Sequence, residues 1–126
     1  MLDFGMIIDD SILRSSDGDI FLIVGATQES IVYTEDRIRQ SGKSITLKSG
    51  YEIGDKFNLI FISDVQDYNE INLYRLFDLV KPGGVFSGNN YFSKNTNVKS
   101  HIDKFMRDNK INFGFWFTSW ILYKQW

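Results

Sequence analysis

Two short apolar runs dominate the hydrophobic pattern of this chain. Residues 20–25 read IFLIVG and residues 57–62 read FNLIFI, and both runs are too short for a helix of ordinary length. A strand with one wet face alternates apolar and polar residues, whereas a strand that is buried on both faces is apolar almost throughout. The pattern therefore predicts that both runs are central, parallel strands of one sheet.

The residues after 57–62 have the pattern of an amphipathic helix. Residues 64–67 are polar, and from Asn69 an apolar residue recurs every third position, in a stripe that two leucines widen. The stripe consists of Ile71, Tyr74, Phe77 and Val80, with Leu73 and Leu76. Pro82 should end the helix because it excludes the α region at Lys81, and the two glycines that follow predict a sharp reversal into a strand at 85–87.

The first half of the chain predicts a further strand and helix around residues 20–25. Residues 1–14 contain two apolar pieces separated by two aspartates, which favours a short hairpin or a strand and turn. After a turn at 26–28, residues 29–40 form a helix with Ile31, Val32, Tyr33 and Ile38 available to face the sheet, and Gly42 ends it. Residues 44–48, which read SITLK, form a strand with Ile45 and Leu47 on one face.

The last third of the chain predicts a helix and a hairpin. Asn95 or Thr96 is the expected N-cap. The helix is indicated by four apolar residues at positions i, i+4, i+7 and i+8, namely Val98, Ile102, Phe105 and Met106. Residues 111–117 and 120–124 then form two antiparallel strands. Aromatic residues make up 16% of the chain and crowd its end, where they can fill a core or build a subunit contact.

These motifs resemble a known family. The strand FNLIFI, the polar cluster after it, the helix ending in LVKPGGVF and the following SGNNYF are similar to the second half of class I, Rossmann-like methyltransferases that depend on S-adenosylmethionine. The resemblance covers residues 57 to the C-terminus well and the earlier part loosely. It implies an α/β fold with a reduced methyltransferase sheet, mostly parallel, with a C-terminal antiparallel hairpin and helices on both faces.

The resemblance also implies that parts of the fold are missing. At 126 residues the chain is a single truncated domain, since the family needs about half as much again. Residues 49–56 are too few for the crossover that should follow the strand at 44–48, because a crossover takes a dozen residues or more. The edge between Ser44 and Lys48 is then uncovered, and uncovered edges pair with other chains. We expect a homo-oligomer through this edge or through the C-terminal aromatic hairpin.

Composition narrows the class of protein. A net charge of -2 argues against a nucleic-acid or membrane partner that is bound by bulk electrostatics. The chain has no cysteine, which excludes disulfides and thiol chemistry, and it has no apolar run long enough to span a bilayer. We expect a cytoplasmic protein.

The implied cofactor, S-adenosylmethionine, needs a glycine-rich turn and an acidic residue. The turn after residues 20–24 supplies Gly25 and Ala26, but Glu29 stands where a later glycine belongs and would repel the carboxylate of the cofactor. Gly25 is either a cofactor contact or a close-packing residue. The strand at 44–48 ends without the carboxylate that would bind the ribose, and Glu52 either replaces it or is an ordinary exposed glutamate.

The implied catalytic residues lie after the two later strands. Metal-dependent relatives place acidic ligands there, whereas this chain aligns Ser63 with the first of them, with Asp64 one residue late, and has Asn89 and Asn90 at the second pair. Neutral amides and hydroxyls hold Mg²⁺ poorly, so we expect no divalent metal. Ser63, Asp64 and Asn89 are then expected to contact the cofactor, and Asp64 and Asn90 to serve catalysis.

The remaining polar residues have simpler interpretations. Asp67 and Glu70 sit near a predicted helix start, where carboxylates stabilise the helix dipole, and His101 is expected on the surface of a helix. The leading hypothesis is a methyltransferase that acts on a small-molecule or sugar acceptor. The alternatives are an inactive methyltransferase fold that serves binding or oligomerisation, and a sensor of S-adenosylmethionine or a related nucleoside.

Overall fold

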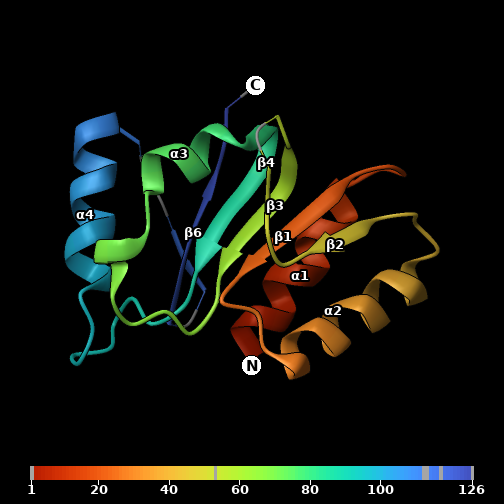
Figure 1. Ribbon diagram of the computed structural model, residues 1–126, viewed down its shortest axis with the longest axis horizontal. Coiled ribbons are helices and arrows are strands. Elements are labelled where there is room, and N and C mark those ends of the chain that lie inside the picture. The colour runs from red at the N-terminus through yellow and green to blue at the C-terminus, as the bar shows by residue number, and fades with distance from the viewer. Residues whose placement is uncertain (1, 53, 112–113, 117, 126) are drawn as a thin grey trace.

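The computed structural model describes residues 2–52, 54–111, 114–116 and 118–125, which form a sheet with helices around it (Figure 1). The helices are α1 (Leu2–Arg14), α2 (Gln28–Ser41), the 3-10 helix η1 (Tyr68–Glu70), α3 (Leu73–Asp78) and α4 (Val98–Asn109). The strands are β1 (Ile20–Val24), β2 (Thr46–Lys48), β3 (Phe57–Ile62), β4 (Val80–Gly88), β5 (Gly114–Trp116) and β6 (Ser119–Tyr123).

The six strands lie in the order β2-β1-β3-β4-β6-β5. The first four are parallel, and the pair β5 and β6 is antiparallel, with β6 running antiparallel to β4. β1 and β3 lie side by side, with Phe21 opposite Leu59. The predicted fold class, a mostly parallel α/β sheet with a C-terminal antiparallel hairpin, is confirmed, and so are the two central strands.

Both faces of the sheet are covered by helices, as predicted. α1 and α2 pack on one face, where Phe21, Ile23 and Phe61 are fully buried. η1, α3 and α4 pack on the other face against residues such as Leu22 and Phe86. Because consecutive strand residues point to opposite faces, burial of both faces explains why β1 and β3 are apolar almost throughout.

The hairpin predicted for residues 1–14 is wrong, because the segment is the helix α1. Its buried residues fall at helical spacing and pack on the sheet: Phe4, Ile7, Ile8 and Ile12. Asp9 and Asp10, which seemed to divide two apolar pieces, lie on the outer side of this helix. Asp9 accepts from Arg37 of α2 at 2.8 Å, and Asp10 accepts from Arg14 at 3.0 Å.

The single helix predicted after Asn69 is also wrong, because the structure contains η1 and the short α3 instead. Ile71 has an extended backbone, and the side chain of Asn72 accepts from the backbone N–H of Arg75, so a new helix starts there. Leu73 and Leu76 are buried, whereas Tyr74 is 47% exposed. The two leucines are therefore buried members of the core, as is Val80, while Ile71 and Phe77 are partly buried against it.

The sharp reversal predicted at Pro82 is absent from this part of the structure, since β4 runs through it. β4 pairs Val80 with Phe57 and Val85 with Leu59, so the extra residues of β4 bulge out of the ladder between these pairs. Gly84 is required there, because a Cβ atom on it would lie 2.9 Å from the carbonyl oxygen of Asn58.

The predictions for the two long helices hold in part. α4 buries Val98, Ile102, Phe105 and Met106 as expected, but its N-cap is Asn97 rather than Asn95 or Thr96. α2 ends at Gly42 with a φ of 75°, as predicted, but it buries Ser30, Thr34 and Ile38, and Val32 is 55% exposed. Residues 112–113 and 117 of the predicted hairpin lie outside the described residues.

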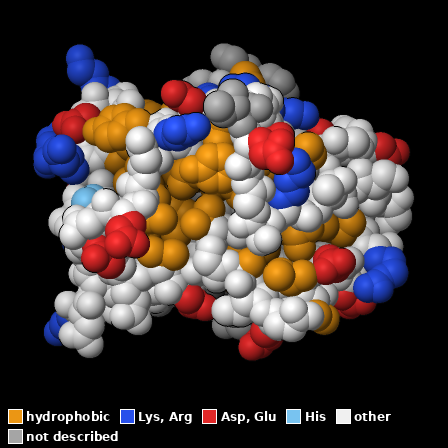
Figure 2. Space-filling model, viewed as in Figure 1, with side chains coloured by type: hydrophobic (Ala, Val, Ile, Leu, Met, Phe, Trp, Pro, Cys, Tyr) orange, Lys and Arg blue, Asp and Glu red, His pale blue; other side chains and the backbone are white. Residues whose placement is uncertain are grey.

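The edge of the sheet next to β1 is formed by β2, a strand of three residues. Residues 49–52 and 54–56, which connect it to β3, contain no helix or strand. Figure 2 shows hydrophobic side chains gathered in the middle of the visible face, in the region where Figure 1 places the space between α3 and β2. Among the described residues, no helix has the length and apolar character that crossing a membrane requires.

Candidate functional site at the carboxyl ends of the parallel strands

The parallel strands bring several of the predicted site residues together. The backbone N–H of Ser63 donates to the carbonyl of Val24 at 2.8 Å, and the N–H of Asn89 donates to Ile62 at 3.2 Å. The turns after β1, β3 and β4 therefore meet at one edge of the sheet, which is the lower edge in Figure 1. In open α/β sheets ligands bind at this edge, outside the carboxyl ends of the strands.

Gly25 is held tightly against the turn after β3. Its φ is 73°, and a Cβ atom on it would lie 2.4 Å from the carbonyl oxygen of Ser63 and 3.1 Å from Cγ2 of Val65. Packing alone therefore requires a glycine here, which supports the second of the two sequence interpretations. Ala26, the next residue, packs against the core between α1, α2 and the sheet.

Asp64 and Asn89 form a reciprocal pair across the ends of β3 and β4. The backbone N–H of Asp64 donates to Oδ1 of Asn89 at 2.9 Å, and Nδ2 of Asn89 donates to Oδ1 of Asp64 at 3.1 Å. Asp64 has a φ of 55°, and Asn90 has a φ of 67°. Left-handed conformations cost energy for residues other than glycine, and they gather at functional sites.

A hollow of about 610 Å³ opens beside the turn that begins at Asn90. Tyr91 and Phe92 form an aromatic wall, and Lys94, Lys99 and Asp103 supply charges. Lys99 donates to Asp103 at 2.7 Å, and the hydroxyl of Tyr91 donates to the same carboxylate. Burial, and then the carboxylate of Asp103, raise the pKa of Tyr91. Burial would raise the pKa of Asp103 as well, but the hydrogen bonds from Lys99 and Tyr91 outweigh it and hold this pKa below its ordinary value.

The N-terminus of α2 is poorly suited to a cofactor carboxylate. Thr27 and Ser30 form a capping box: the N–H of Thr27 donates to Oγ of Ser30 at 2.9 Å, and the N–H of Ser30 donates to Oγ1 of Thr27 at 3.1 Å. Glu29 adds a negative charge in the same turn. Two donors are thus already occupied, and a bound carboxylate would meet a like charge.

The usual partner of the ribose is also missing from the described end of β2. Lys48, the last residue of that strand, pairs with Asp55 at 3.4 Å. Glu52 is exposed, and its backbone N–H donates to Asp55 at 2.9 Å. S-adenosylmethionine thus fits this edge only in part, through Asp64 and Asn89. In the described part of the chain, no three His, Cys, Asp or Glu residues are grouped to hold a metal, and the prediction on divalent metals stays a prediction.

Trp120 and Tyr68 form a buried aromatic pair beside this edge, on the face that α4 covers, and the sequence did not predict it. Trp120 and Tyr68 are fully buried, and Nε1 of Trp120 donates to the hydroxyl of Tyr68 at 3.3 Å. A Cβ atom on Gly88, the last residue of β4, would lie 2.7 Å from Trp120 and 2.8 Å from Tyr68. Burial raises the pKa of Tyr68, so this hydroxyl stays neutral. The one sequence signal was the glycine in SGNN.

Asn97 ties the start of α4 to η1. Its Oδ1 accepts from the N–H of Tyr68 at 2.7 Å, and its Nδ2 donates to Asp67 at 2.9 Å. Asp67 also accepts from the N–H of Asn69 at 2.9 Å. The N–H of Asn69 and then the amide of Asn97 hold the pKa of Asp67 below its ordinary value of 3.8.

This pKa shift predicts a loss of stability in acid. Because the folded chain depresses the pKa of Asp67, the stability that its carboxylate contributes is complete above the ordinary value of 3.8 and is lost as the pH falls through the depressed value. Thermal unfolding of the wild type and of Asp67→Asn should therefore differ at pH 6, and the difference should begin to fall below pH 3.8 and disappear below the depressed pKa. An equal difference at both pH values would contradict this role for Asp67.

Comparisons with known proteins support the fold. No family model and no curated protein matches the sequence. Among solved structures, precorrin 8w decarboxylase from Methanobacterium thermoautotrophicum is similar over 87% of this chain and 72% of its own, with a TM-score of 0.53 and 14% identity. Phosphoethanolamine N-methyltransferase 2 from Haemonchus contortus, in complex with S-adenosylhomocysteine, is similar over 100% of this chain and 38% of its own, with a TM-score of 0.50 and 11% identity.

The second of these structures, with its TM-score of 0.50, shows a methyltransferase-like fold. An O-methyltransferase from Bacillus cereus with bound S-adenosylhomocysteine is also similar, over 94% of this chain and 76% of its own, with a TM-score of 0.48 and 13% identity. At these identities the similarity concerns the methyltransferase-like fold and not the chemistry, which has to be argued from the site.

Proposed function

We propose that this methyltransferase-like protein binds S-adenosylmethionine at the carboxyl ends of β1, β3 and β4, and that it is a methyltransferase for a small-molecule or sugar acceptor. The observation that carries the proposal is the pairing of Asp64 with Asn89 at the edge where this fold binds ligands. The left-handed backbones of Asp64 and Asn90 at the same edge also support it.

The roles of the residues follow from their positions. S-adenosylmethionine, when bound, supplies the methyl group. Asp64 presents a carboxylate that Asn89 orients, and we expect this pair to bind and orient the cofactor, since the N-terminus of α2 and the end of β2 lack the usual partners. The aromatic wall and charged groups of the hollow beside Asn90 suit a small, polar ring as acceptor.

Calorimetric titration of S-adenosylmethionine and S-adenosylhomocysteine tests the proposal. We expect saturable binding to the wild type and binding weakened about ten- to a hundredfold in Asp64→Asn, because a charged hydrogen-bonding group is lost. Asparagine tolerates the left-handed backbone at this position, so the turn should persist. Glu35→Gln, which removes an exposed carboxylate on α2, is the matched control and should bind like the wild type.

The absence of heat at millimolar cofactor would contradict the proposal and would favour a second candidate, a methyltransferase fold that serves binding or assembly. The capping box with Glu29 and the missing ribose carboxylate favour this candidate. So do Phe92 and Phe115, which are 54% and 43% exposed and have ring centroids 5.1 Å apart. If it serves assembly, we expect a homo-oligomer through the edge at β2 or through these aromatic residues, and light scattering that finds a monomer would contradict this expectation.

A further inference from the structure

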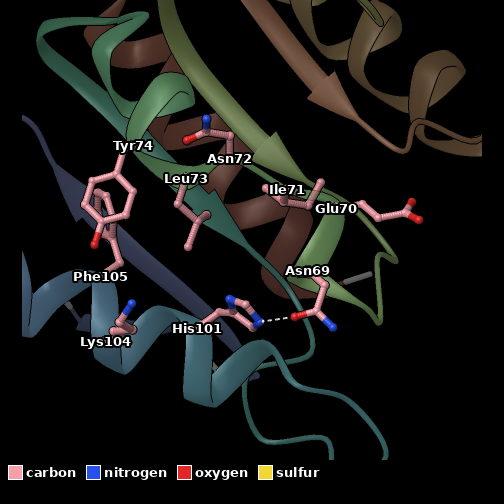
Figure 3. Close-up of a pocket in the computed structure, with 9 residues that line it drawn as sticks. All are labelled: Asn69, Glu70, Ile71, Asn72, Leu73, Tyr74, His101, Lys104 and Phe105. Atoms are coloured by element: carbon pink, nitrogen blue, oxygen red, sulfur yellow. Dashed lines mark hydrogen bonds between the residues drawn. The ribbon is translucent and has the colours of Figure 1, made fainter.

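A second hollow lies on the face of the sheet that α3 and α4 cover, and none of the residues of the proposed cofactor site lines it. Its volume is about 340 Å³, and it opens between residues 69–74 and α4 (Figure 3). Pockets of this size hold small ligands of one or two rings. None of the residues that line it belongs to the turns that contain Gly25, Asp64 or Asn89, so its ligand is a separate question.

The hollow has a rigid apolar floor and one aromatic wall. Leu73 is 5% exposed and Phe105 is 1% exposed. The ring of Tyr74 packs edge-on against Phe105 with centroids 5.1 Å apart, and its hydroxyl donates to Asp108 at 2.9 Å. Both contacts fix the Tyr74 ring, whose open side can stack on a flat, apolar ligand.

The rim of the hollow is positively charged on the side of α4. Lys104 and His101 lie three residues apart on this helix and both line the hollow. Within the described residues, Lys104 forms no ion pair. The one carboxylate among the lining residues is that of Glu70, and in Figure 3 it points away from Lys104 and His101.

Two asparagine side chains line opposite sides of the hollow. Oδ1 of Asn72 accepts from the N–H of Arg75 at 3.1 Å, and in Figure 3 the amide of Asn72 points away from Lys104 and His101. Oδ1 of Asn69 lies 2.9 Å from Nε2 of His101, which keeps the imidazole in place across the opening (Figure 3). The hollow thus offers one full positive charge and an apolar floor.

We propose that this hollow binds a small monoanion with a flat apolar body, of the class of aromatic carboxylates. The carboxylate lies at Lys104, and the ring lies on Leu73 against Tyr74. A neutral ring leaves Lys104 without a counter-charge. A dianion such as inorganic phosphate brings a second charge that the hollow does not match, and it leaves the apolar floor exposed to water.

Titration of benzoate into the ¹⁵N-labelled protein, followed by NMR, tests this proposal. We expect saturable shifts of backbone signals in residues 69–74 and 101–105. Binding should weaken about three- to fivefold in Lys104→Gln, because the contact is solvent-exposed. It should weaken by a similar factor of about three to ten in Tyr74→Ala, which removes the stacking ring. Benzyl alcohol and inorganic phosphate should each bind more weakly than benzoate.

Arg107→Gln is the matched control, because it removes one positive charge from the same helix at an exposed residue outside the hollow. It should bind benzoate like the wild type, and equal weakening in Arg107→Gln and Lys104→Gln would overturn the proposal in favour of unspecific attraction to α4. Shifts confined to other residues, or none, would also overturn it. The result does not depend on S-adenosylmethionine binding, since Lys104 and Tyr74 take no part in that site.

Discussion

Replacement of Trp120 with alanine should lower the free energy of unfolding by about 3 to 5 kcal/mol, as expected when a large, buried aromatic side chain is truncated. Trp120 is fully buried, and its ring packs edge-on against Phe86 with centroids 5.0 Å apart. It also occupies the space beside Gly88, where a Cβ atom would lie 2.7 Å from Nε1 of Trp120. Urea denaturation followed by circular dichroism measures the change.

Trp120→Phe is the matched variant for this position. It keeps an aromatic ring against Phe86 but removes the N–H that donates to the hydroxyl of Tyr68 at 3.3 Å. We expect a loss of about 1 to 3 kcal/mol, because the buried hydroxyl of Tyr68 loses a partner. If Trp120→Ala cost less than Trp120→Phe, the ring would not be the main source of stability at the end of β4.

The second large effect is expected at Gly25. Gly25→Ala should lower the free energy of unfolding by about 2 to 4 kcal/mol, the sum of a left-handed backbone and an overpacked contact. The left-handed φ is 73°, and the new Cβ atom would lie 2.4 Å from the carbonyl oxygen of Ser63. That oxygen belongs to the backbone, so relief requires the turns after β1 and β3 to separate.

Gly42→Ala separates the two contributions. Gly42 has nearly the same φ, 75°, but nothing lies within 4 Å of the Cβ position. We expect this variant to lose only about 1 kcal/mol, the cost of the backbone conformation alone. Denaturant unfolding of both variants gives the comparison, and equal losses would show that the contact with Ser63 yields freely.

The contact between Gly25 and Ser63 also changes how the glycine is interpreted. In this fold a glycine after the first strand is commonly explained by the approach of a ligand, but here the neighbouring backbone already requires it. The case for a cofactor therefore depends on Asp64 and Asn89. For this reason the titration with Asp64→Asn is more informative about function than any variant of Gly25.

The central part of the fold could be predicted from the sequence because it depends on local composition. β1 and β3 are apolar almost throughout since both faces are covered, and four apolar residues at helical spacing identified α4. The order in which strand, helix and strand follow one another then implied the parallel sheet. The turns after the strands were predictable as a group, because the carboxyl ends of parallel strands meet at one edge.

Contacts between distant segments decided the rest. The helix predicted after Asn69 is divided where Asn72 caps α3, and Asn97, nearly thirty residues along the chain, holds η1 through Tyr68 and Asp67. The pairing of Asp64 with Asn89 and the hollow between α3 and α4 depend in the same way on segments that meet only in the folded chain. Hydrophobic burial leaves a periodic record in the sequence, whereas a hydrogen bond between two distant polar side chains leaves none. The sheet and the meeting of its turns were therefore predictable, and the pairing of Asp64 with Asn89 and the hollow beside α4 were not.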